Sequence, residues 1–155
     1  MFSAVMAVLG LSSLTETLVS WKGFIQNIVA TYQEIVHPVF QFLFGWFPFE
    51  IPTFVFDYLT IGIFVGIVSA NGLFAAGAKF QPERKIPGLE KPRWLVSIVA
   101  PFIFASIWPP HLVAQILKAI FARSMFDKYM ARYIVKWLGI VAICFVVLLS
   151  INAML

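Results

Sequence analysis

The chain has 155 residues, of which 61% are hydrophobic and 12% are charged, and its mean hydropathy is +0.93. A water-soluble domain is about half apolar and about a quarter charged, so this composition excludes an ordinary soluble domain and predicts an all-α integral membrane protein. The single cysteine, Cys144, excludes an intramolecular disulfide and any site built from several thiolates.

The eleven lysine and arginine residues gather in two clusters, and this distribution opposes nucleic acid as a partner despite the formal net charge of +4. Five of them lie within residues 79–93 and four within residues 123–136. Basic clusters beside apolar spans are typical of loops that stay in the cytoplasm, so we expect the basic loops to be cytoplasmic. The compactness of the chain and its lack of a signal sequence lead us to expect a bacterial inner membrane. The side chains expected to contact anionic lipid headgroups or a partner protein are Arg84, Lys85, Lys91, Arg93, Lys128, Arg132 and Lys136.

Residues 1–52 are predicted to form an N-terminal amphipathic region at the membrane surface. Residues 1–11 are apolar but too short to span, and no basic residue precedes them as in a signal peptide. Within residues 19–44, apolar residues recur at alternating steps of four and three: Trp21, Ile25, Ile28, Tyr32, Ile35, Val39 and Phe42. This stripe predicts an interfacial helix, which Pro38 should kink or divide. The alternative is a further span, whose polar residues would have to face other protein.

Residues 53–155 are predicted to form a transmembrane helical domain, whose first clear span covers residues 54–78. Three small residues in this span, Gly62, Gly66 and Ala70, follow one another at steps of four and predict a close helix–helix contact. Asn71 is expected to hydrogen-bond across helices in the same region. Asp57, one turn inside the span and without an evident partner, is expected to reach the headgroups.

The apolar run over residues 94–121 is broken by Pro109 and Pro110, which predict that a helix ends near Ile107. If the run crosses as one kinked span, the two basic clusters lie on opposite sides of the membrane. If it forms a re-entrant hairpin, both clusters lie in the cytoplasm, which agrees better with the positive-inside rule. The expected tip of the hairpin is formed by Trp108, Pro109, Pro110 and His111.

A basic amphipathic helix is predicted to lead into the last span, over residues 134–155. Lys128, Arg132 and Lys136 follow one another at steps of four and therefore share one face of that helix. The span itself is free of charged residues from Trp137 onward.

The sequence contains few residues that could form a catalytic or metal-binding site. Glu34 and His37 have the i, i+3 spacing of two metal ligands on one helix face, but a bundle site needs that motif twice with further carboxylates. No nucleophile motif, phosphate-binding loop or dinucleotide fingerprint is present. We therefore expect no metal, no cofactor and no enzymatic activity.

Two functions are consistent with these features. The first is a small accessory or scaffolding subunit that packs through its small-residue face against other subunits of a membrane complex. The second is a homo-oligomeric channel or pore-forming protein, for which a re-entrant segment would be characteristic.

Overall fold

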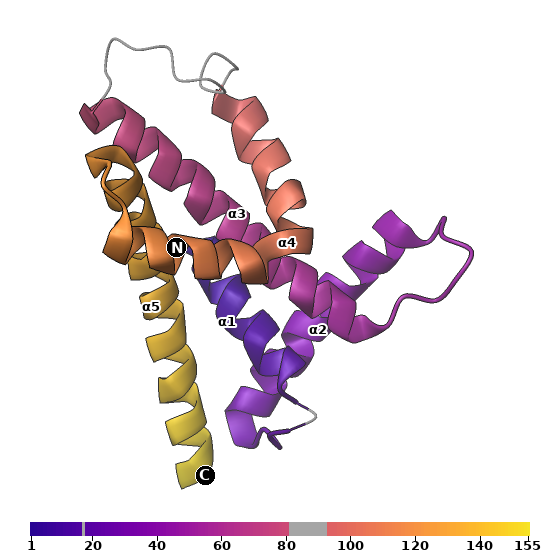
Figure 1. Cartoon of the computed structure of the whole chain (residues 1–155). Helices are drawn as coiled ribbons and strands as arrows, with labels where there is room; N and C mark the ends of the chain where they lie inside the picture. Colours follow the sequence, from indigo (N-terminus) through magenta and orange to yellow (C-terminus); the bar gives the residue numbers. More distant parts are fainter. Residues whose placement is uncertain (17, 81–92) are drawn as a thin grey trace. The chain divides into compact units, whose positions relative to one another are not determined.

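The computed structural model describes residues 1–16, 18–80 and 93–155, and this part of the chain folds into five α-helices with no strand (Figure 1). The helices are α1 (Phe2–Leu14), α2 (Gly23–Phe44), α3 (Thr53–Phe80), α4 (Arg93–Phe121) and α5 (Met125–Met154). The all-helical prediction is confirmed for these residues. In this part of the chain, α3 and α5 are long and apolar enough to cross a membrane, judged by length and composition alone.

Contacts divide the chain into two compact units. Unit 1 comprises Met1–Ile61 and Val141–Leu155, and unit 2 comprises Gly62–Ile140. The boundaries of these units fall within α3 and within α5.

Unit 1 is built around the buried face of α2. Ile25, Val29, Tyr32 and Val36 are buried, and Trp21 and Ile25 pack with Val29 against Phe145, Leu148 and Leu149 of α5. Of the predicted apolar stripe, Trp21, Ile25 and Tyr32 are buried, whereas Ile28, Ile35, Val39 and Phe42 are exposed. The buried residues also recur at steps of four and three, so period alone could not choose between two adjacent faces of the same helix.

Three local features of unit 1 modify the predicted N-terminal region. The first residues form α1, whose Ala7, Val8 and Gly10 are buried. Pro38 does not divide α2, which continues to Phe44. The amide of Asn152 in α5 binds the segment before α2, accepting from the Lys22 backbone N–H at 2.8 Å and donating to the Ser20 carbonyl at 3.1 Å.

Unit 2 contains the second part of α3, all of α4 and the first part of α5. The predicted break in α4 is confirmed, because Ile107 has non-helical backbone angles (φ −120°, ψ 16°). The two following prolines lack backbone N–H groups, so the helix cannot continue its hydrogen-bond ladder through this point. Figure 1 shows the second arm of α4 turning sharply away from the first.

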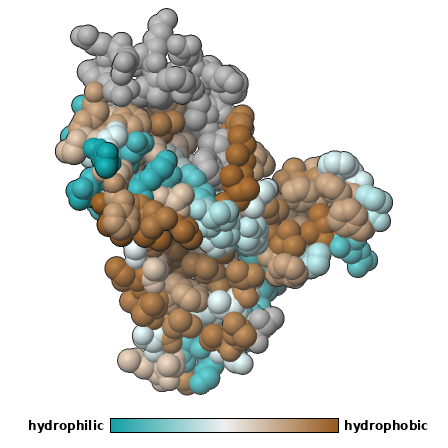
Figure 2. All heavy atoms as spheres, viewed as in Figure 1, coloured by the Kyte–Doolittle hydropathy of each residue, from teal (hydrophilic) through white to brown (hydrophobic). Residues whose placement is uncertain are grey.

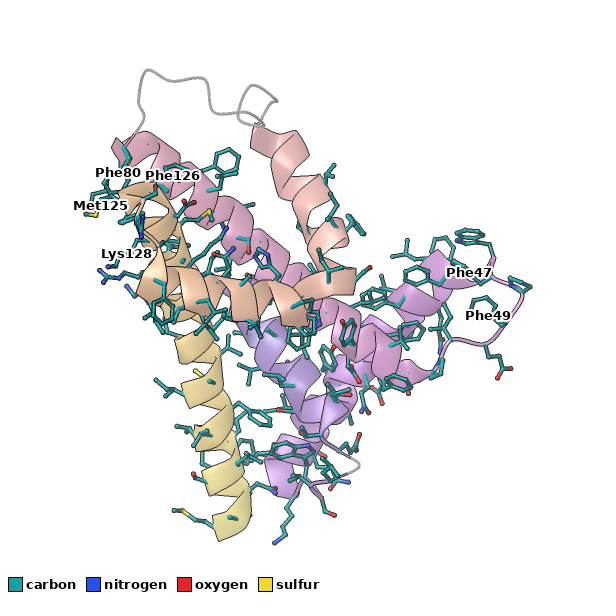
Figure 3. The ribbon with its side chains drawn as sticks, in the orientation of Figure 1. Phe47, Phe49, Phe80, Met125, Phe126 and Lys128 are labelled. Atoms are coloured by element: carbon teal, nitrogen blue, oxygen red, sulfur yellow. The ribbon has the colours of Figure 1, made fainter. Side chains whose placement is uncertain are left out.

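The expected basic helix and the last span form one continuous helix, α5, from Met125 to Met154. Within unit 2 its first part contacts the end of α3: the Lys79 ammonium lies 4.6 Å from the ring centre of Tyr129, and Phe80 packs edge-on against the same ring. Figure 3 shows Phe80 near Met125 and Phe126 in this region.

Candidate functional site

The most distinctive polar site of unit 1 surrounds Asp57, one turn into α3. Its side chain is 3% exposed. The Ser13 hydroxyl on α1 donates to Asp57 Oδ2 at 2.9 Å, and His37 Nε2 on α2 lies 3.1 Å from Oδ1. A buried carboxylate is costly unless charged or hydrogen-bonded groups surround it, and here two other helices supply those groups.

The network continues from Asp57 to the surface. Gln33 Nε2 donates to the Ser13 hydroxyl at 2.9 Å and to Glu16 Oε2 at 2.6 Å. Gln33 is partly buried and Glu16 is exposed. Side chains of α1, α2 and α3 therefore form one hydrogen-bonded chain that begins in the interior and ends at solvent-accessible Glu16.

Aromatic side chains enclose the other side of the site. The His37 ring lies edge-on to Tyr32, with 6.2 Å between ring centres, and 5.8 Å from the ring centre of Phe56. Burial, reinforced by the nearby charge of Asp57, raises the pKa of the Tyr32 phenol above its ordinary value. The Tyr32 phenol therefore stays protonated at physiological pH.

Gly10 allows α1 to come close to this site. A Cβ atom at Gly10 would lie 3.2 Å from the Tyr32 hydroxyl and 3.4 Å from the Asp57 carbonyl oxygen. The first distance is tight for a carbon atom, so the glycine at position 10 lets α1 pack closely against the Tyr32 hydroxyl.

The site contains serine, histidine and aspartate, but their order differs from that of a serine hydrolase. In a hydrolase triad, the histidine accepts the serine proton while the aspartate orients the other ring nitrogen. Here the hydroxyl and the ring both bind the same carboxylate, so Ser13 directs its proton to Asp57 and not to His37. Among the described residues, no group of three or more His, Cys, Asp or Glu side chains has a metal-binding arrangement. The arrangement stabilises a buried carboxylate and connects three helices.

The expectation that Asp57 has no partner is wrong, because Asp57 is buried and has two partners in unit 1. The sequence held one signal for this: Gln33 and His37 lie four residues apart and therefore share one face of α2. The partners of Asp57 could not be read from the sequence, because His37 is 20 residues and Ser13 is 44 residues away from it along the chain.

A second polar cluster lies in unit 2, where α4 resumes after its break. The Ser69 hydroxyl of α3 is 3.0 Å from His111 Nε2, and Gln115 Nε2 is 3.4 Å from the same nitrogen. Ser69 and Gln115 are buried. Of the predicted tip residues, Trp108, Pro109 and His111 are partly buried and Pro110 is exposed. His111 therefore connects α4 to α3.

The residues of the predicted small-residue face are buried or partly buried in the structure. Gly62, Gly66 and Ala70 are all buried, and Asn71 is partly buried. A Cβ at Gly62 would overlap the backbone of Ala105 in α4, with 2.6 Å to its carbonyl oxygen. The expectation that this face meets another subunit is therefore corrected: α4 covers it at Gly62.

The predicted lipid-contact residues are described only in part. Arg84, Lys85 and Lys91 lie outside the described residues, as does the side chain of Arg93. On α5, Arg132 and Lys136 are exposed and Lys128 is partly buried; Figure 3 labels Lys128.

Comparison with known proteins does not add a function to this geometry. A scan of protein-family models and searches of curated proteins and solved structures find no match.

Proposed function

We propose that the chain is an integral membrane protein that acts as an accessory or scaffolding subunit of a membrane complex. The observation that carries this proposal is the exposure of α5: in its most apolar 18-residue window, 11% of the residues are buried. Figure 2 shows apolar side chains over much of the surface in the part of the view where the C-terminal half of α5 lies. Exposing a large aliphatic side chain to water costs about 1.5–3 kcal/mol, so lipid or other protein has to cover this helix.

The exposed residues of α5 form a helical face. Ile140, Ile143, Cys144 and Val147 follow the i, i+3, i+4, i+7 pattern and are all exposed. This face, and not the small-residue face of α3, is free to contact a partner subunit. The exposed apolar residues of α2 form a second candidate surface, in keeping with a helix that lies along the membrane surface.

For the orientation, we propose that the basic segments lie in the cytoplasm of a bacterial cell, where Lys128, Arg132 and Lys136 contact anionic headgroups. The broken α4 is then either a re-entrant segment or a kinked span; the sharp turn at Ile107 supports a break within the membrane region. We propose no enzymatic role, and the bonding order around Asp57 supports this.

The proposal is tested on the full chain, tagged and expressed in its own host. We expect it to stay in membranes after an alkaline carbonate wash, and release into the supernatant would overturn the membrane assignment. Native mass spectrometry after gentle detergent extraction should then show masses that contain other chains. A single mass at a multiple of 17.5 kDa would overturn the accessory role in favour of the homo-oligomeric channel, which conductance in liposomes would then test.

A matched pair of substitutions separates partner contact from lipid contact. Ile143, in the middle of the exposed α5 face, is 66% exposed, and Met154, at its end, is 86% exposed. Ile143→Trp adds bulk that lipid accommodates but a packed partner does not, so the co-purified chains should decrease several-fold. Met154→Trp is the control and should leave the complex intact. Equal complex formation by both variants would show that lipid, and not a partner, covers Ile143.

A further inference from the structure

An open groove of about 760 Å³ lies in unit 1 where α2 ends and α3 begins. Its walls come from the last turn of α2, the segment 45–52 and the first turn of α3. Pro48 and Pro52 prevent this segment from continuing either helix, and the Trp46 indole N–H closes the end of α2 by donating to the Leu43 carbonyl at 2.8 Å. The volume is within the range of small-ligand sites.

Aromatic rings set at different angles line the groove. The ring centre of Phe47 lies 5.9 Å from that of Phe44 and 5.3 Å from that of Phe49, and the ring planes are inclined by 45° and 55°. Phe56 completes the aromatic part of the wall. Figure 3 shows Phe47 and Phe49 on the connecting segment. Ring faces carry negative potential and attract cations, which is how aromatic cages recognise substituted ammonium groups.

The charge that lines the groove is negative, like the potential of the ring faces. Glu50 is its one charged lining residue, and it makes no hydrogen bond or ion pair with any residue that the structure describes. No lysine or arginine occurs between Lys22 and Lys79 in the whole sequence. The chain near the groove therefore supplies no cation for Glu50, and a ligand with a positive group would complement both the carboxylate and the rings.

The position of the groove indicates which kind of ligand carries that positive group. It lies at the beginning of α3, and under the function proposed above, on which this inference rests, this end of the helix is at headgroup level. Phe49 in the groove wall and Phe54 next to it are exposed and offer apolar contact for acyl chains. We propose that the groove binds the ammonium headgroup of a zwitterionic phospholipid, phosphatidylcholine or phosphatidylethanolamine, with Glu50 and the Phe47 ring contacting the ammonium.

The test uses the full chain in detergent and native mass spectrometry with three lipids of equal short acyl chains: phosphatidylcholine, phosphatidylethanolamine and anionic phosphatidylglycerol. We expect at least one zwitterionic lipid to bind about tenfold more tightly than phosphatidylglycerol. Glu50→Gln and Phe47→Leu should each remove most of that preference. Their matched controls are Glu34→Gln, which removes an equally exposed charge from α2, and Phe42→Leu, which removes an exposed ring outside the groove; both should retain it.

Each remaining outcome contradicts the proposal. Equal binding of the three lipids, or an equal loss in Glu50→Gln and Glu34→Gln, would show that the groove does not recognise the headgroup. Binding of glycerophosphocholine as tight as that of the lipid would replace the lipid by a soluble ligand, and a dimer removed by Glu50→Gln would replace it by a second copy of the chain. If the chain stays in carbonate-washed membranes but shows no lipid preference, only this inference fails; if the wash releases it, the proposed function fails as well.

Discussion

α3 and α5 are both long and apolar, but they are used in different ways. In the most apolar 18-residue window of each helix, 61% of α3 is buried and 11% of α5 is buried. α3 carries Asp57, Gly62 and Ser69, and each of these contacts another helix of its own unit. The corresponding part of α5 presents branched aliphatic side chains outward.

Both helices are long and apolar enough to cross a membrane, but only α5 leaves most of its apolar window exposed, so length and composition alone do not show which helix packs inside the fold. α5, with the higher window hydropathy of 2.6, is the mostly exposed helix, whereas α3, at 1.9, is mostly buried. The lower value of α3 reflects the polar and small residues through which it bonds and closely contacts its neighbours. Polar residues within an apolar helix thus indicate the side that faces protein.

The largest expected effect comes from removing the carboxylate of α3. Asp57→Ala leaves the Ser13 hydroxyl and the His37 ring without their buried acceptor, so we expect the free energy of unfolding to fall by about 3 kcal/mol. Denaturation of the protein in mild detergent, followed by circular dichroism, measures this change. Glu34→Ala, at an exposed position of α2, is the control. A loss below about 1 kcal/mol for Asp57→Ala would contradict the view that α3 is held to its neighbours by this buried carboxylate.

The comparison is sharpened by one glycine from each helix. Gly62→Ala places a methyl group against the Ala105 backbone, which cannot move aside as a side chain could, so we expect a loss of about 2 kcal/mol. A Cβ at Gly139 on α5 meets nothing within 4 Å. Gly139→Ala should therefore stabilise the protein by about 0.5–1 kcal/mol through helix propensity. Equal effects of the two substitutions, measured by thermal unfolding, would contradict the close contact of α3.

A smaller effect is expected at alkaline pH, from the Tyr32 phenol beside Asp57. Because burial raises the pKa of Tyr32 in the folded chain, the unfolded chain loses this proton first, near pH 10.0. Above that pH the unfolded state binds fewer protons than the folded state. The free energy of unfolding should therefore fall by up to about 1.4 kcal/mol per pH unit. The difference between wild type and Tyr32→Phe, followed by unfolding at pH 9 to 11 (about one unit on each side of the ordinary tyrosine pKa), isolates this contribution. Parallel curves for the two proteins would show that the phenol is not buried beside the carboxylate.

The candidate sites were predictable only where the signal was local. The end of a helix at Ile107 followed from Pro109 and Pro110, because a proline restricts the residue before it whatever the fold. The sequence predicted that Gly62 would make a close helix–helix contact, because small residues permit close approach. It did not predict that the partner is Ala105, which lies 43 residues away in the sequence. The partners of Asp57 were missed for the same reason.

The sequence by itself determined the helical class, the approximate limits of α3 and the break in α4, because hydrophobic runs and prolines act on neighbouring residues. Only the tertiary structure decided which face of α2 is buried, which helix covers Gly62 and which groups satisfy Asp57. Whether a side chain is buried depends on which residues pack against it in the folded chain, and those residues lie far apart in the sequence.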